Sequence, residues 1–132
     1  SIVFGAVGTA GQRCTTTRRV FVHESRMEEL ERRLTSAYKQ VRIGDPLEAG
    51  TLMGQLIDGA SVERYENAVQ KAVAHGGRLL CGGKRLDRPG FFVEPAIVVA
   101  RGEWDIVQTE TFGPVLYLVP FKTLDEAIAA QN

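Results

Sequence analysis

Apolar side chains are arranged along this chain in two ways, at regular intervals in some stretches and in short continuous runs in others. In one stretch they return every three or four positions, the spacing of an amphipathic helix of about four turns: Met27, Leu30, Leu34, Tyr38 and Val41. The run Gly44-Asp45-Pro46 is a typical helix terminator. Ser25, followed by Glu28 three residues later, fits a capping box at the other end. The pattern therefore predicts a helix that begins near Ser25 and ends before Gly44.

A second helix is predicted over residues 61–75, because its apolar positions also share one face: Val62, Tyr65, Val69 and Val73. Gly76-Gly77 stops it, and His75 in the last turn suits the negative end of the helix dipole. A last helix should begin at Leu124, with Thr123 as its cap.

Short apolar and β-branched runs predict strands between these helices. The candidates are 18–24, a short buried strand at 78–81, an extended segment at 91–99 that Pro95 marks as an edge or a bend, and 115–120. Residues 1–10 fit either a short buried helix or a strand that runs into a glycine turn. Because strand and helix patterns alternate, we expect an α/β fold with an open, largely parallel sheet and flanking helices.

Composition narrows the function classes. The chain has 132 residues, and its 16 Lys and Arg residues balance 16 Asp and Glu residues. This balance gives no field that would attract nucleic acid or an anionic membrane, and no segment has the ~20 apolar residues needed to cross a bilayer. Cys14 and Cys81 do not form a disulfide framework, so we expect a reducing, cytoplasmic location. His23 and His75 lie far from any Cys or Asp cluster, so no metal site is expected.

The segment from Gly8 to Thr17 places Cys14 in a turn rich in glycine and threonine, just before a predicted strand. A thiol attacks only as its thiolate, which needs nearby positive charge and room for an electrophile. Arg13 and Arg18 flank the sulfur and can supply the charge, while the small neighbours leave space. The alternative is that Cys14 is a small buried apolar residue. Cys81, inside an apolar strand, is most simply a core residue.

A second segment, Thr109 to Pro114, sets Glu110 between two threonines and before Phe112 and a Gly-Pro turn. A carboxylate can bind sugar hydroxyls and an aromatic ring can pack on a flat heterocycle, so the segment can contact a ligand. The alternative is an ordinary loop glutamate and a core phenylalanine.

Three glycines near the start, Gly5, Gly8 and Gly11, superficially suggest a dinucleotide-binding loop. Their spacing is G-x-x-G-x-x-G rather than G-x-G-x-x-G, and a strand rather than a helix follows. We therefore assign these glycines to packing or turns.

Four segments together resemble the NAD(P)-dependent aldehyde dehydrogenase superfamily over essentially the whole chain. In order they are Gly11-Gln12-Arg13-Cys14, Arg19-Val20-Phe21-Val22-His23-Glu24, Phe92-Val93-Glu94-Pro95-Ala96-Ile97 and Glu110-Thr111-Phe112-Gly113-Pro114-Val115. Arg13, the threonines after Cys14 and Asp87-Arg88-Pro89-Gly90 are most similar to the antiquitin branch, which oxidises aminoadipate semialdehyde.

The resemblance implies roles for individual residues. Cys14 would attack the aldehyde to give a thiohemiacetal, hydride would pass to NAD (or NADP), and water would hydrolyse the thioester. Glu110 would hold hydroxyls of the nicotinamide ribose, Phe112 would pack near the nicotinamide, and Arg13 would line the pocket of a carboxylate-bearing semialdehyde. The complete enzyme would be a homo-oligomer that binds neither nucleic acid nor membrane.

In that family the general base, the oxyanion asparagine and the cofactor-binding domain precede the cysteine, and the oligomerisation strands also lie outside these limits. We therefore expect residues 1–132 to be a partial catalytic domain with little or no turnover on its own. Two other readings stay open, a non-catalytic folded remnant or scaffold module and a cysteine-dependent esterase that does not use NAD.

Overall fold

A four-stranded sheet forms the centre of the computed structural model, which describes residues 1–132. The strand order is β1-β4-β3-β2, with β1 and β3 parallel to β4 and β2 antiparallel at one edge. The strands are β1 (Arg19–His23), β2 (Arg78–Cys81), β3 (Ala96–Val99) and β4 (Val115–Phe121). The predicted α/β fold with an open, largely parallel sheet is confirmed.

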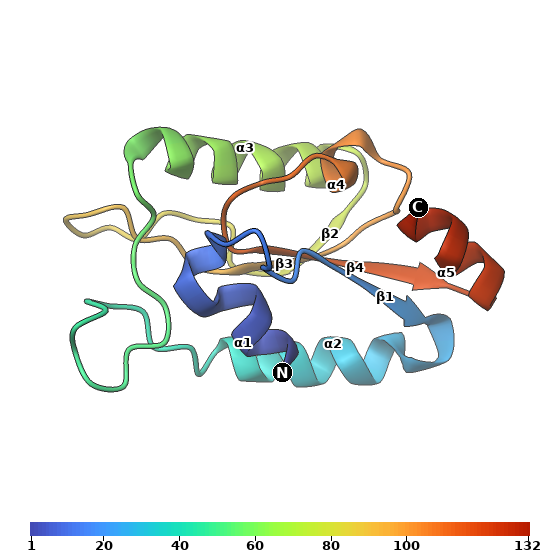
Figure 1. The fold of residues 1–132 in the computed structure, drawn as a ribbon, viewed down its shortest axis with the longest axis horizontal. Coiled ribbons are helices and arrows are strands. Elements are labelled where there is room, and N and C mark those ends of the chain that lie inside the picture. Colours follow the sequence, from blue (N-terminus) through green and yellow to red (C-terminus); the bar gives the residue numbers. More distant parts are fainter.

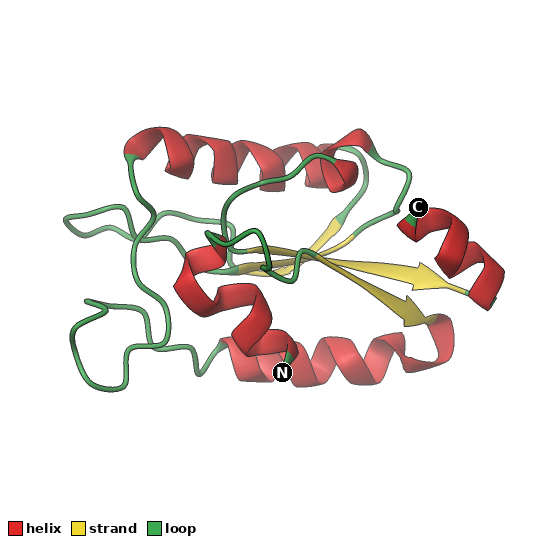
Figure 2. Ribbon diagram, in the orientation of Figure 1, coloured by secondary structure: helices red, strands yellow, loops and turns green.

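Helices cover both faces of this sheet (Figure 1). The long helix α2 lies on one face together with α1, and α3 lies on the other face with α4, while α5 follows β4 beyond the end of the sheet (Figure 2). The helical segments are α1 (Ile2–Val7), the 3₁₀ turn η1 (Gly8–Gly11), α2 (Glu24–Tyr38), α3 (Gly59–Ala74), α4 (Asp105–Gln108) and α5 (Leu124–Gln131). No helix is long and apolar enough to traverse a bilayer.

The buried core lies between the sheet and the two long helices. β4 is its centre, since Leu116 and Leu118 are fully buried, and Ile97 of the neighbouring β3 joins them. Leu34 of α2 and Tyr65 of α3 are buried in this core, and their two helices lie on opposite faces of the sheet (Figure 1). Burial of such side chains contributes about 1.5–3 kcal/mol each, which fixes the helices against the strands.

Helix α2 begins earlier than the sequence predicts. The helix follows β1 without a loop, so His23 rather than Ser25 is its cap, and the His23 Nδ1 accepts a hydrogen bond from the Ser25 N–H at 3.2 Å. The helix also ends at Tyr38, well before the Gly44 terminator, because tighter turns follow it: the Val41 N–H bonds the Tyr38 carbonyl at 3.1 Å.

Two strand predictions also need correction. β2 is the sheet edge rather than a buried strand, and its Leu79 is 39% exposed. The extended segment 91–99 contributes only Ala96–Val99 to the sheet, because Pro95 has no N–H to donate and the Glu94 N–H bonds the Lys84 carbonyl at 2.8 Å instead.

In α3, the apolar face includes Ala72 rather than Val73, which is 42% exposed. Helix α4 was not predicted, because four residues carry no periodic signal. The cap of α5 is confirmed as a full capping box, in which Thr123 and Glu126 each accept from the other's backbone N–H.

Candidate functional site

The two candidate segments meet at the amino ends of β1 and β4. The Cys14 loop leads into β1 and the Thr109–Pro114 loop leads into β4. Because these strands pair in parallel, with Arg19 opposite Tyr117, the loops that precede them emerge at the same edge of the sheet. Ligands of open α/β sheets usually bind at the carboxyl ends of the strands. This site lies at their amino ends instead.

A cavity of about 460 Å³ lies between the two loops, and both Cys14 and Glu110 line it. The Cys14 side chain is exposed rather than buried in the core. Tyr117 of β4 also lines the cavity, and burial raises the pKa of its hydroxyl to about 12, so it stays neutral. A larger cavity of about 930 Å³ at the other end of β1, beside α5, contains neither cysteine.

The chain reaches Cys14 through a left-handed segment. Thr9, Ala10 and Gly11 have φ angles of 57°, 54° and 70°, which costs roughly 1–2 kcal/mol for each residue that has a β-carbon. Tertiary contacts hold this conformation: Ala10 is buried, and the Gln12 side-chain oxygen accepts from the Ile57 N–H at 3.0 Å. The loop is therefore fixed to the segment before α3 as well as to the sheet.

Cys14 itself lies in a tight turn. The Thr16 N–H bonds the Arg13 carbonyl at 3.1 Å, and the Thr16 hydroxyl accepts from the Arg13 N–H at 3.2 Å. The backbone N–H of Cys14 makes no hydrogen bond within the protein. The turn thus presents a thiol and a free N–H donor from the same residue.

Arg18 connects this turn to the second loop. Its Nε donates to Oε1 of Glu110 at 3.1 Å, and its guanidinium carbon lies 5.0 Å from the centre of the Phe112 ring. The Glu110 side chain is 58% exposed, and residue Phe112 is 45% exposed. Glu110 therefore keeps a second oxygen for a ligand, and Phe112 presents an open aromatic surface next to it.

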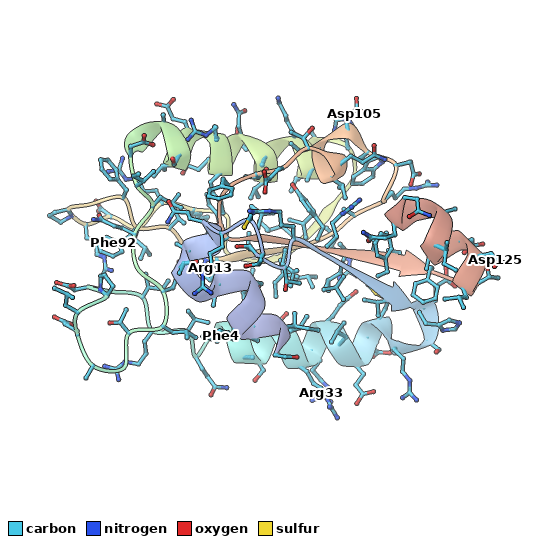
Figure 3. All side chains as sticks on the ribbon, in the orientation of Figure 1. Phe4, Arg13, Arg33, Phe92, Asp105 and Asp125 are labelled. Carbon is cyan, nitrogen blue, oxygen red and sulfur yellow. The ribbon has the colours of Figure 1, made fainter.

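Arg13 is exposed on the loop that carries Cys14 (Figure 3). Its Nε donates to the Thr9 hydroxyl at 3.1 Å, and its two terminal nitrogens make no hydrogen bond within the protein. Arg13 does not line the 460 Å³ cavity, so the structure separates it from the wall that Cys14 and Glu110 share.

From its position in the sequence, Arg18 is only a positive charge near the sulfur. Its link to Glu110 spans 92 positions, and no local pattern could have revealed it. Cys81, the second free thiol, is half-buried in β2, where burial raises its pKa. No group of His, Cys, Asp and Glu side chains is arranged to hold a metal ion.

The structure thus defines an open α/β domain in which an exposed thiol shares a cavity with a carboxylate. A family model described as the aldehyde dehydrogenase family matches residues 1–132, and the chain belongs to this family.

Individual relatives agree with this family assignment. The chain is 49% identical over 132 residues to aldehyde dehydrogenase family 7 member A1 of Malus domestica, covering 100% of this chain and 26% of that protein. It is 48% identical over 133 residues to alpha-aminoadipic semialdehyde dehydrogenase of Bos taurus, covering 100% of this chain and 25% of that protein. The chain therefore spans about a quarter of the length of these relatives.

Solved structures agree with the fold. Lactaldehyde dehydrogenase from Escherichia coli superimposes with a TM-score of 0.93 at 38% identity, covering 99% of this chain and 28% of that one. Betaine aldehyde dehydrogenase from Staphylococcus aureus, in complex with NAD⁺, gives a TM-score of 0.94 at 33% identity, covering 99% of this chain and 27% of that one.

Proposed function

We propose that this chain supplies the nucleophile and part of the cofactor site of an NAD(P)-dependent aldehyde dehydrogenase, with Cys14 as the nucleophile. The observation that supports this most directly is the exposed Cys14 thiol on the same cavity wall as Glu110, in a chain that belongs to this family. A buried, inert cysteine would lie in apolar packing instead.

The chemistry begins when the Cys14 thiolate forms a bond to the carbonyl carbon of the aldehyde. The carbonyl oxygen then carries a negative charge, and the unpaired N–H of Cys14 is the donor that this chain offers to it. Loss of hydride from this thiohemiacetal gives a thioester on Sγ. Water then cleaves the thioester, which releases a carboxylic acid and restores the thiol.

Glu110 and Phe112 fit one end of a nicotinamide cofactor. Glu110 has one carboxylate oxygen bound to Arg18, and its other oxygen makes no bond within the protein, so it can accept from ribose hydroxyls. The exposed Phe112 ring offers a flat apolar contact beside it. When bound, NAD or NADP supplies the hydride acceptor.

The substrate class that we propose is an aldehyde with a distal carboxylate. One supporting observation lies outside the 460 Å³ cavity: the two terminal nitrogens of Arg13, one residue before Cys14, are unengaged, so they can meet the distal end of a substrate that extends out of the cavity. A second is the similarity to the Bos taurus relative, which is an alpha-aminoadipic semialdehyde dehydrogenase. A guanidinium fork matches a carboxylate in a bidentate geometry.

The test replaces Cys14 in the protein that carries this sequence. In Cys14→Ala, formation of NADH or NADPH from an aldehyde should fall by more than about 10³-fold, because the covalent route is lost. Cys81→Ala is the matched control and should keep its activity. Retained turnover in Cys14→Ala contradicts the proposal. Hydrolysis of an activated ester without NAD(P)⁺, in a protein that does not oxidise aldehydes, favours the esterase reading instead.

The substrate class has its own test. Arg13→Gln should raise KM for a semialdehyde that carries a carboxylate by about tenfold or more, corresponding to the loss of a charge-assisted pair. KM for a neutral aliphatic aldehyde of similar length should stay unchanged. An equal rise for both aldehydes would mean that Arg13 has no part in carboxylate recognition.

A further inference from the structure

The Arg18 side chain bonds to both loops of the site at once. Nη2 donates to the Arg13 carbonyl at 2.8 Å, and Nη1 donates to the carbonyls of Gly11 at 3.3 Å and Thr111 at 2.6 Å. Nε completes the set with its bond to Glu110 at 3.1 Å. The side chain is only 17% exposed, so these oxygens, rather than water, satisfy most of its N–H groups.

One of these bonds acts on the peptide unit that joins Arg13 to Cys14. In a trans peptide the carbonyl and the N–H lie in one plane and point in opposite directions, and no peptide bond in this chain is cis. The Arg13 carbonyl is held twice, by Arg18 and by the Thr16 N–H at 3.1 Å. Fixing this oxygen therefore fixes the direction of the Cys14 N–H.

We propose that Arg18 is a positioning residue that orients and polarises the Cys14 N–H for the oxyanion formed during attack on a carbonyl. This inference rests on the proposed role of Cys14 as nucleophile. A guanidinium that binds the carbonyl side of an amide draws electron density from it, which strengthens the N–H on the other side as a donor. The same side chain keeps Glu110 and Phe112 next to the turn.

A different role for Arg18, as a free positive charge that stabilises the Cys14 thiolate, fits the contacts less well. The charge of Arg18 is already paired with the Glu110 carboxylate at 3.1 Å, and three backbone carbonyls occupy its other donors. Pairing of this kind reduces the field that a cation exerts on a third group. The two roles predict different behaviour, because only one of them acts through an oxyanion.

Two reactions of the same sulfur separate these roles. Iodoacetamide alkylates a thiolate at a saturated carbon, and iodide leaves without any oxyanion. With 4-nitrophenyl acetate, the thiolate adds to a carbonyl, an oxyanion forms and collapses, 4-nitrophenolate leaves, and the acetyl group stays on Sγ. Both rates can be measured on the purified protein without cofactor, and peptide mass spectrometry locates each adduct.

In Arg18→Met, acetylation of Cys14 should slow by about 10- to 100-fold, less than the 10²–10³-fold effect of deleting an oxyanion donor outright. Alkylation of Cys14 should stay within about threefold of the unmodified rate, because thiolate nucleophilicity alone controls it. Arg18→Lys keeps the charge but replaces the planar guanidinium with a single ammonium group. Its acetylation rate should also fall more than its alkylation rate, but by a smaller factor than in Arg18→Met. This second variant carries the test if Arg18→Met does not fold.

Arg78→Met is the matched control, because Arg78 also pairs with a glutamate, Glu31, at 2.7 Å and 2.9 Å, but on the edge strand. It should change neither rate. An equal decrease of both rates in Arg18→Met and Arg18→Lys, or no decrease in either, overturns the positioning role while leaving the nucleophile intact. If the unmodified protein is not acetylated on Cys14, the proposed nucleophile itself fails, and this inference fails with it.

Discussion

Gly11 lies directly against the peptide carbonyl of Gly113, so close that a β-carbon at position 11 would overlap this oxygen. The contact is backbone to backbone, and it joins the loop that carries Cys14 to the loop that carries Glu110. Neither side can move away cheaply, because Gly113 is buried and continues into β4. The two loops can therefore lie this close together only because glycine at position 11 has no β-carbon.

Gly11→Ala should lower the free energy of unfolding by about 2–4 kcal/mol, since overpacking adds to the cost of a left-handed φ of 70°. Urea denaturation measures this change. Gly76→Ala is the control, because Gly76 has a φ of 99° but no atom within 4 Å of the added carbon, so it shows the conformational cost alone. Equal losses in the two variants would show that the contact with Gly113 contributes nothing.

Loss of the hydroxyl group should lower the stability of the protein at Tyr65 but not at Tyr38, although both tyrosines are buried. The Tyr65 hydroxyl donates to the Glu94 carbonyl and accepts from the Gly83 N–H at 3.0 Å, whereas the Tyr38 hydroxyl is buried without a partner. Tyr65→Phe should therefore cost about 1–3 kcal/mol, because it leaves buried groups unpaired. Tyr38→Phe should be neutral or stabilising. Thermal unfolding of the two variants compares them directly, and equal shifts contradict the hydrogen-bond assignment.

The two thiols should differ in reactivity near neutral pH. Cys14 is exposed at the cavity, whereas burial raises the pKa of Cys81 and hinders access to it. Limiting iodoacetamide should label Cys14 at least about tenfold faster than Cys81, since the thiolate is the reacting species. Peptide mass spectrometry after short exposures gives the ratio. Preferential labelling of Cys81 would argue against an accessible thiol in the Cys14 turn.

Acid should weaken the capping interactions at the start of α3 and α5, in which the carboxylates of Asp58 and Glu126 take part. The Ser61 hydrogen bonds lower the pKa of Asp58, and the backbone N–H groups of Lys122 and Thr123 lower the pKa of Glu126. A carboxyl group whose pKa is lowered in the folded state contributes stability above its unfolded pKa and loses it as the pH falls through the folded pKa. The free energy of unfolding should therefore decrease below about pH 4.5.

The variant Asp58→Asn with Glu126→Gln tests this assignment. Asparagine caps helices about as well as aspartate, so stability at pH 7 should change little. Urea denaturation from pH 7 to pH 3 should then show a smaller loss than in the unmodified protein. An identical acid dependence would mean that other groups control it.

Periodicity and motif spacing predict the large elements of this fold correctly. β1 and β4 follow from short β-branched runs, and α2 and α3 follow from apolar residues three and four apart. These signals are strong because each element buries one side of itself against the core. The cap of α5 at Thr123 is equally local, since all of its partners lie within four residues.

Features that depend on contacts between residues far apart in the sequence could not be predicted from local patterns. The exposure of β2 follows from its place at the end of the strand order, which its own four residues do not encode. The left-handed residues Thr9 and Ala10 are held by tertiary contacts, against their intrinsic preference. The bond of Arg18 to Glu110 needs the parallel pairing of β1 with β4 before it can exist.

That parallel pairing also determines where the chain can change its length. Arg19 of β1 lies opposite Tyr117 of β4. One extra residue between Cys14 and Arg19 would either move Cys14 relative to the Glu110 loop or turn the inward side chains of β1 outward. An extra residue between Glu110 and Val115 would have the same effect on the other loop and on β4. The exposed loop 44–51 has no such constraint, because its side chains lie away from the cavity. Insertions, tags or grafted peptides belong in that loop, and the spacings of the two motifs should be kept in any redesigned version.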